Sequence, residues 1–164
     1  MTIIIKNSYT LLYKEFKFKC CIGKNGSTYN KKEGDRKTPR GKFKIENLYF
    51  RKDRIKKPST SLRCIGIKKN MFWCNDINFP KKYNKLFKIE EKIKHEKLKR
   101  IDSKYDLLIP IKYNFKKTIV GKGSCIFIHI TKDYKPTAGC IALKEKDFLI
   151  MLKLIKKNSK IKIF

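Results

Sequence analysis

GSCIFIHITKDYKPTAGCIAL, residues 123–143, is the stretch from which the fold and the chemistry of this chain can be predicted. Its first part, Ser124–Ile130, is short and rich in apolar and β-branched residues, which indicates a buried strand that contains His129. A polar run, KDYKP, has the composition of a turn. Gly139 then precedes Cys140 and a second apolar run, and a residue without Cβ permits a sharp bend there. The stretch therefore places one imidazole and one thiol at the two ends of a tight loop.

A thiol beside an imidazole is a chemically meaningful pair. The thiolate is a strong nucleophile, and a neighbouring imidazole can take its proton. Taken singly, Cys140 in an apolar segment is more often an inert core residue, and His129 on a strand is more often structural. The pair, with Thr-Ala-Gly directly before the cysteine, favours covalent catalysis with Cys140 as nucleophile and His129 as base.

These residues resemble the core motif of the YkuD-type L,D-transpeptidases, in which a His and a spacer precede Ser/Thr-x-Gly-Cys. Here seven residues separate His129 from the TAGC of Thr137–Cys140, which is closest to a branch with a short spacer. Two positions differ from the wider family: Ile130 stands in place of a glycine, and Ala142 in place of an arginine or asparagine. The resemblance extends over further segments, namely GDRKTPRG at 34–41, WCND at 73–76, YN at 83–84, HE at 95–96, Asp102, YD at 105–106, YN at 113–114 and GKGS at 121–124.

The resemblance implies a β-sandwich-like catalytic fold and a set of supporting residues. Gly139, Ile141 and Thr137 would form or support an oxyanion hole. Trp73, Asp76 and Tyr105 would lie toward the substrate groove. A buried tryptophan followed by a turn aspartate explains Trp73 and Asp76 equally well.

The family also implies the substrate. The donor would be a peptidoglycan stem peptide that is cut after its third residue, with loss of a terminal D-amino acid. The acceptor would be an amine of another stem peptide, a D-amino acid or a protein; attack by water would instead make the chain an L,D-carboxypeptidase. The chemistry needs no metal, nucleotide or other cofactor. The sequence does not identify the group that orients His129, for which a backbone carbonyl is one candidate.

Length and patterning favour one domain over residues 1–164, mainly β with one or two helices. The clearest helix is expected at 145–157, where Phe148, Met151 or Leu152, and Ile155 form an apolar stripe. A second helix is suggested by the spacing of Leu86, Ile89, Ile93 and Leu98. Alternating or apolar runs elsewhere predict strands, including 105–113 as a central strand in which Pro110 marks an edge or a bulge.

The formal charge of +29 raises a different possibility, a basic nucleic-acid-binding domain. Aromatic residues set among lysines could stack on bases; they are Tyr9, Phe16, Phe18, Tyr49 and Phe50. The excess is nearly all lysine, with 37 lysines against six arginines, and it is spread along the chain. We therefore expect a solvated cationic surface that attracts anions loosely, and no specific nucleic-acid partner.

The six cysteines form no C-x-x-C pair and have no histidine cluster beside them, so we expect neither a zinc site nor a disulfide framework. No apolar run is long enough to span a membrane, and the start of the chain lacks the features of a secretory signal. The resemblance points to the periplasm or cell envelope, whereas the missing signal leaves a cytoplasmic location open.

Overall fold

The computed structural model describes residues 1–88 and 92–164. Within these ranges it contains fifteen strands and one helix, α1 (Glu145–Leu154). The strands are β1 (Thr2–Asn7), β2 (Thr10–Tyr13), β3 (Phe16–Lys19), β4 (Ser27–Thr28), β5 (Thr38–Pro39), β6 (Gly41–Lys44), β7 (Leu48–Phe50), β8 (Cys64–Gly66), β9 (Phe72–Cys74), β10 (Leu86–Phe87), β11 (His95–Lys97), β12 (Leu107–Pro110), β13 (Phe127–Ile130), β14 (Ile141–Leu143) and β15 (Lys160–Ile163). The prediction of a mainly β chain is confirmed.

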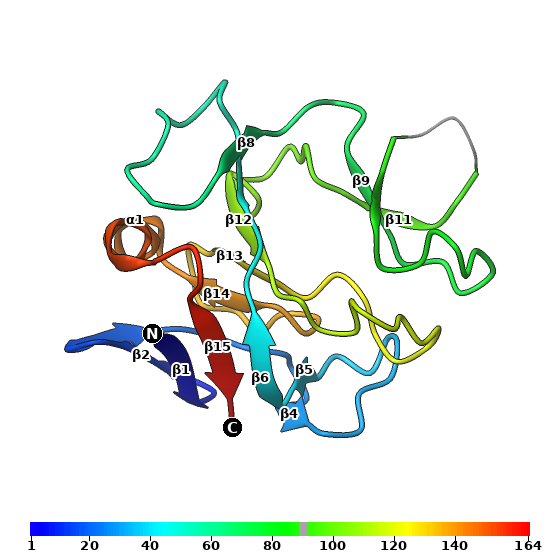
Figure 1. Cartoon of the computed structure of the whole chain (residues 1–164), viewed down its shortest axis with the longest axis horizontal. Helices are drawn as coiled ribbons and strands as arrows, with labels where there is room; N and C mark the ends of the chain where they lie inside the picture. The colour runs from blue at the N-terminus through cyan, green and yellow to red at the C-terminus, as the bar shows by residue number, and fades with distance from the viewer. Residues whose placement is uncertain (89–91) are drawn as a thin grey trace.

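The first five-stranded sheet has the order β3-β2-β1-β15-β6. Its first three strands form an antiparallel meander, and β1 pairs in parallel with β15, so that Ile3 lies opposite Ile161. The two ends of the chain are therefore neighbours in one sheet (Figure 1).

The second five-stranded sheet, in the order β14-β13-β12-β7-β8, carries the stretch that dominates the sequence analysis. The predicted strand 105–113 is its central strand, β12, which pairs with β13 and β7. The expectation that Pro110 marks an edge or a bulge is wrong. Pro110 is the last residue of β12, opposite Phe127, where a missing N–H disturbs little of the ladder.

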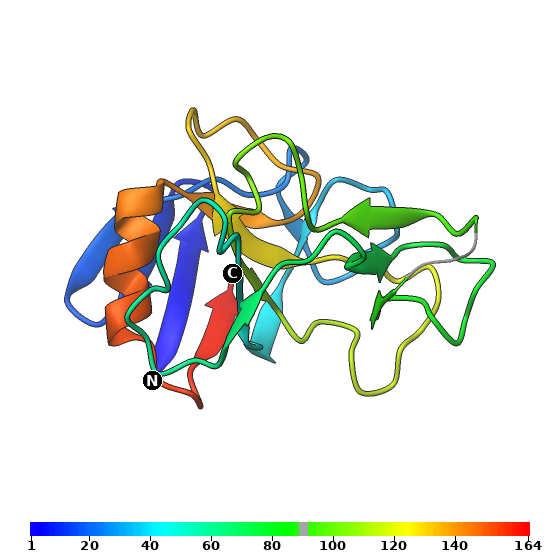
Figure 2. The same cartoon turned by 90° about the horizontal axis from the view of Figure 1, so that it is seen from above.

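One apolar core joins the two sheets and α1. It takes alternate residues from the first sheet, such as Ile3 and Ile5, and from the second sheet, such as Leu107 and Ile109. Phe148, Met151 and Leu152 add the buried stripe of α1, as predicted. The layered, sandwich-like arrangement is visible in Figures 1 and 2, where α1 lies at one end of the long axis and the small sheet described next lies at the other.

The segment that suggested a second helix forms strands in its described part. Leu86 and Glu96 both lie opposite Trp73, because β10 and β11 flank β9 in a three-stranded sheet. Ile93 and Leu98 are buried, so their apolar character is used, but by this sheet and its connections. Ile89 lies outside the described residues. The helical spacing was therefore misleading, and one helix is found in the described chain.

A second, smaller cluster of buried side chains connects this sheet to the second five-stranded sheet. It consists of Tyr49, Ile67, Trp73, Leu98, Tyr105, Leu108, Phe127 and Cys140. The ring of Phe127 makes edge-on contacts with those of Trp73 and Tyr105. The cluster covers the face of β13 that is turned away from the main core, and it forms the floor of the site.

Candidate functional site

The register of β13 and β14 brings His129 and Cys140 to one face of the sheet. The two strands are parallel, with Ile128 opposite Ile141 and His129 opposite Ala142. Cys140 therefore lies opposite Phe127, and the Phe127 N–H points at Cys140 Sγ from 3.4 Å. Side chains two positions apart on neighbouring strands share a face, so the imidazole and the thiol lie diagonally beside each other.

Both side chains line one cleft of about 650 Å³. The described part of its wall comes from the loop after β4, the residue after β9, β11 and the segment that follows it, the segment before β13, β13 itself, and the loop between β13 and β14 with the middle of β14. The volume lies within the range of ordinary small-molecule sites. Cys140 is thus buried in the sheet but open to a hollow large enough for a peptide segment.

His129 is held by its own strand. Its Nδ1 lies 2.9 Å from the carbonyl oxygen of Ile130. A carbonyl only accepts hydrogen bonds, so Nδ1 carries the proton and Nε2 of the neutral ring keeps its lone pair. The Tyr105 ring packs edge-on against the imidazole, with 5.4 Å between ring centres. The orienting group that the sequence left open is therefore a backbone carbonyl.

Cys140 is a neutral thiol in this setting. Its Sγ donates to the carbonyl oxygen of Cys125 at 3.1 Å. Burial raises the pKa of Cys140 to about 12, and the Phe127 N–H opposes that change only in part. Burial likewise lowers the pKa of His129 to about 4. Near pH 7 the pair is therefore a neutral thiol and a neutral imidazole.

The turn before Cys140 is closed by the side chain of Thr137. The hydroxyl donates to Cys140 O at 2.6 Å and accepts from the Gly139 N–H at 3.1 Å. Gly139 has φ +140°, and a Cβ there would lie 2.9 Å from the carbonyl oxygen of Lys37. Only glycine fits both requirements, so the bend at this position depends on the G of the TAGC motif.

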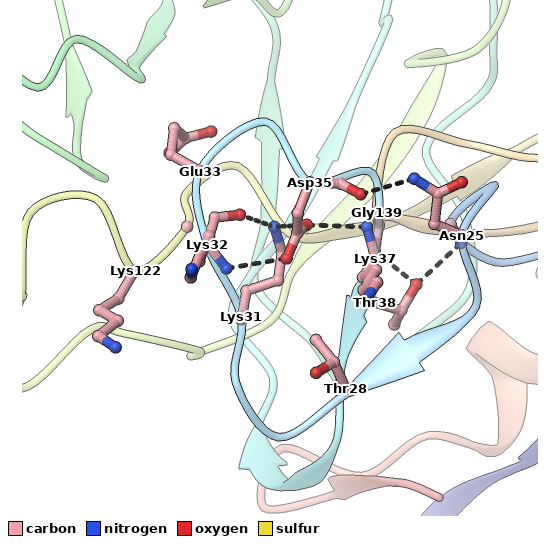
Figure 3. Close-up of polar contacts among 12 residues, drawn as sticks. Asn25, Thr28, Lys31, Lys32, Glu33, Asp35, Lys37, Thr38, Lys122 and Gly139 are labelled. Carbon is pink, nitrogen blue, oxygen red and sulfur yellow. Dashed lines mark hydrogen bonds and ion pairs between the residues drawn. The ribbon is translucent and has the colours of Figure 1, made fainter.

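The GDRKTPRG segment at 34–41 packs directly behind this turn. Thr38 Oγ1 donates to the carbonyl oxygen of Gly139 at 2.8 Å and accepts from the Gly23 N–H at 2.9 Å. Figure 3 shows Thr38 and Gly139 at this junction, beside the loop that contains Lys31 and Asp35. Two motifs about a hundred residues apart in the sequence therefore meet through one buried hydroxyl.

The family model for YkuD, the L,D-transpeptidase catalytic domain, matches residues 2–163. This chain belongs to the YkuD family. A search of curated proteins gave no match. The family match extends over both five-stranded sheets and over the cleft with His129 and Cys140, and it makes this an L,D-transpeptidase-type chain with a peptidoglycan-related function.

The three residues predicted to lie toward the substrate groove occupy different places in the YkuD domain. Tyr105 lines the cleft, and its hydroxyl donates to Glu96 Oε1 at 3.0 Å. Trp73 lies beneath the cleft in the small cluster, with its Nε1–H bonded to Asn84 Oδ1 at 3.0 Å. The Asp76 carboxylate accepts from the N–H groups of Asn78 and Lys94, which is a turn role. Neither Trp73 nor Asp76 is among the described residues that line the cleft.

The predicted oxyanion-hole residues surround the nucleophile. Gly139 and Thr137 line the cleft, whereas Ile141 is buried in β14 opposite Ile128. The Gly139 N–H is already bonded to Thr137 in this state. The catalytic and supporting roles given to these residues, and to Cys140 and His129, stay predictions.

Several charged residues of the cleft were not singled out by the sequence. They are Lys31, Glu33, Arg36, Arg100, Lys104, Asp133 and Lys135, together with Glu96, which was noted only as part of the resemblance. A usable signal existed for Lys31 and Glu33, because they come directly before the GDRKTPRG segment. In a chain with 37 lysines, one functional lysine does not stand out by its type.

Four other features of this YkuD domain bear on the alternatives. Of the aromatics considered for base stacking, Phe18, Tyr49 and Phe50 are buried, whereas Tyr9 and Phe16 are exposed. Among residues 1–88 and 92–164, no group of three His, Cys, Asp or Glu side chains is arranged to hold a metal. The six cysteines are free thiols. Within the same ranges, no helix has the length and apolar character needed to span a membrane.

Proposed function

We propose that this chain is a cysteine-dependent L,D-transpeptidase in which Cys140 attacks a peptidoglycan stem peptide and His129 moves the protons. The observation that carries the proposal is the shared cleft, in which a thiol and an imidazole with a free Nε2 lie on one sheet face. This pair can form a covalent intermediate without a metal or nucleotide.

In the first half-reaction, His129 Nε2 takes the thiol proton as Cys140 Sγ attacks the carbonyl carbon of the third residue of the donor. The negative charge moves to the substrate oxygen. The C–N bond then breaks, and the departing D-amino acid takes the proton from His129. A thioester remains on Cys140. Because thiol and imidazole both start neutral, we assign His129 to general-base catalysis, without a standing ion pair.

Backbone N–H groups between Gly139 and Ile141 are the proposed donors to the oxyanion. The Gly139 N–H is engaged by Thr137, and Ile141 belongs to the β13–β14 ladder. The Cys140 N–H is therefore the first candidate donor. One such donor contributes about 3 kcal/mol of transition-state stabilisation in other enzymes.

In the second half-reaction, an amine gives a proton to His129 and attacks the thioester carbonyl. The S–C bond breaks, a new amide forms, and Cys140 recovers its proton from His129. Water in place of the amine would give the carboxypeptidase product. A peptidoglycan substrate places the proposed site of action in the cell envelope.

Acylation by a carbapenem tests the nucleophile. After incubation, intact-mass and peptide mapping should find one added carbapenem on Cys140. Cys140→Ala should give no adduct, and Cys125→Ala, which removes the other thiol of the cleft, should still give it. A folded wild-type protein without an adduct at Cys140 contradicts the proposal.

Product analysis tests the acceptor. A tetrapeptide donor is incubated with and without an amino-acid or dipeptide acceptor, and the products are separated by mass. A cross-linked or exchanged product supports transfer. If only the tripeptide forms at every acceptor concentration, the chain is a carboxypeptidase and the transferase half of the proposal is wrong.

A further inference from the structure

Lys31 carries a buried ammonium at the edge of the cleft. Its side chain is only 3% exposed, although it lines the same hollow as Cys140. Nζ donates to Asp35 Oδ1 and to the carbonyl oxygen of Lys32, both at 2.6 Å (Figure 3). The Asp35 carboxylate accepts in turn from the N–H groups of Lys32 and Lys37. Lysine is rarely buried to this degree, and here a whole loop is folded around its charge.

The backbone between Gly123 and Cys125 connects this ammonium to the nucleophile. The stem of Lys31 lies flat against Gly123, so that a Cβ there would be 2.9 Å from its Cγ and 3.3 Å from its Nζ. Two residues later, the Cys125 carbonyl accepts the hydrogen bond from Cys140 Sγ at 3.1 Å. Lys31, Cys125 and Cys140 all line the same cleft, and the charge of Lys31 acts on the thiol by lowering its pKa.

The other charged groups that line the cleft are Glu33, Glu96, Asp133, Arg36, Arg100, Lys104 and Lys135. Arg100 is bonded to Glu96 and Asp102. Lys135 pairs with Asp133 and is 85% exposed. Arg36 and Lys104 are exposed to water, which screens their charge. Lys31 is therefore the buried cation among the described groups of this wall.

The carboxylates near Lys31 and Cys140 act in the opposite direction. Glu33 accepts hydrogen bonds from the hydroxyls of Tyr83 and Ser124, and Asp35 partly neutralises the ammonium it holds. Burial is the main cause that raises the pKa of Cys140; Glu96 raises it further, whereas Lys31 lowers it. A buried charge acts through a low dielectric, so removing Lys31 takes away a cation that opposes the effects of burial and Glu96 on the pKa of the thiol.

We propose that Lys31 is an electrostatic positioning residue of this site: its ammonium, fixed by Asp35, favours the deprotonated sulfur of Cys140 and the oxyanion that follows. The role rests on the proposed function of Cys140 as nucleophile. Lys31 acts through the field it sets up across the cleft, without itself exchanging a proton.

The test measures the alkylation of Cys140 by iodoacetamide from pH 6 to 11, with peptide mapping to separate the six cysteines. The alkylation midpoint is the pH at which half of Cys140 has reacted after a fixed time, and it lies below the pKa of the thiol. Lys31→Met keeps the length of the side chain and removes its charge. We expect its alkylation midpoint to lie about one pH unit above that of the wild type, with a roughly tenfold slower rate at pH 8. Lys31→Arg should restore most of the rate.

Lys122→Met is the matched control, because Lys122 is exposed on the neighbouring segment and does not line the described cleft (Figure 3). Its midpoint should equal that of the wild type. If Lys31→Met does not fold, the double variant Lys31→Met/Asp35→Asn removes both charges together and should show a smaller shift in the same direction. Thermal melts establish which variants are folded.

Equal midpoints for the wild type and the folded Lys31→Met or double variant overturn the inference. So does an arginine variant as slow as the methionine variant, since that result assigns the loss to packing. Alkylation requires no peptidoglycan. A carbapenem adduct on Cys140 together with unchanged midpoints therefore removes the role of Lys31 and leaves the proposed function standing.

Discussion

Residues along β13 and β14 point alternately to two faces of the sheet, and the two faces have different surroundings. On one face, Ile128, Ile130, Ile141 and Leu143 join the main core against α1 and the first sheet. On the other, Phe127, His129 and Cys140 face the small cluster and the cleft. The apolar face gains stability by burial. The cleft face buries a thiol and an imidazole, which costs stability and supports chemistry.

The largest expected effect lies on the cleft face. Cys140→Ala should reduce transpeptidation by about 10⁴-fold, because the nucleophile is lost while the cleft is preserved. Its free energy of unfolding should fall by about 1 to 3 kcal/mol, because the buried Phe127 N–H loses its acceptor. Steady-state rates with a tetrapeptide donor and an unfolding curve measure the two quantities. Residual activity above one tenth of the wild-type rate would show that Cys140 is not the nucleophile.

The reverse result is expected on the apolar face. Ile128→Ala removes a fully buried side chain, and we expect a loss of about 4 kcal/mol in the free energy of unfolding. The rate of Cys140 alkylation in the folded variant should change by less than about twofold, because Ile128 points away from the cleft. Urea unfolding and peptide-mapped alkylation test this. A large loss of thiol reactivity at full stability would show that the two faces are not separable.

Of the two faces of the β13–β14 pair, the cleft face should contribute to the pH dependence of stability. His129 is neutral in the fold, with a pKa lowered by burial to about 4, whereas the unfolded chain binds that proton near pH 6.5. Stability therefore falls as the pH drops from about 6.5 to 4, by about 3 kcal/mol for this group. At high pH the raised pKa of Cys140 has the mirror effect from about 9 to 12.

Urea unfolding at a series of pH values measures both changes in stability. We call the fall toward low pH the acid limb and the fall toward high pH the alkaline limb. His129→Gln should flatten the acid limb. Cys140→Ala should make the alkaline limb shallower without abolishing it, because burial also raises the pKa values of Cys20 and Cys21. Ile128→Ala should lower the whole curve without changing its slopes. If the acid limb remains in His129→Gln, groups other than His129 cause it.

The smallest effect concerns the turn that joins the two strands. Gly139→Ala combines a φ of +140° with a Cβ 2.9 Å from Lys37 O, whereas Gly34→Ala meets nothing within 4 Å at a φ of +76°. Gly139→Ala should therefore cost about 2 kcal/mol more than Gly34→Ala in unfolding free energy, and it should also slow alkylation of Cys140. Equal costs would mean that the close approach to Lys37 is relieved by a small backbone movement.

The sequence was sufficient to predict the parts that are local in the chain. The TAGC motif, the strand that ends near His129 and the stripe of α1 each depend on residues a few positions apart, and local periodicity reports such features. The pairing of His129 with Cys140 in one cleft was also expected, because only a short loop separates them.

The parts that were missed depend on contacts distant in sequence. The spacing of Leu86, Ile93 and Leu98 resembled a helix, but pairing of both flanking strands with β9 outweighs that preference. Trp73 lies under the cleft because Asn84 and Phe127 fix its ring from other segments. Lys31 and the wall around it arise from a loop that meets Gly123 and Gly139 only in three dimensions.

The parallel pairing of β1 with β15 has a consequence for the order of assembly. The first strand cannot pair with β15 until Lys160–Ile163 has left the ribosome, so β1 keeps an unpaired edge while the residues between the two strands are synthesised. Contacts of such long sequence separation slow folding. The strands that flank the Cys140 turn share one core with α1, β1 and β15, so this core is complete only after β15 has been made. We therefore expect nascent, incomplete chains to be inactive and prone to aggregate.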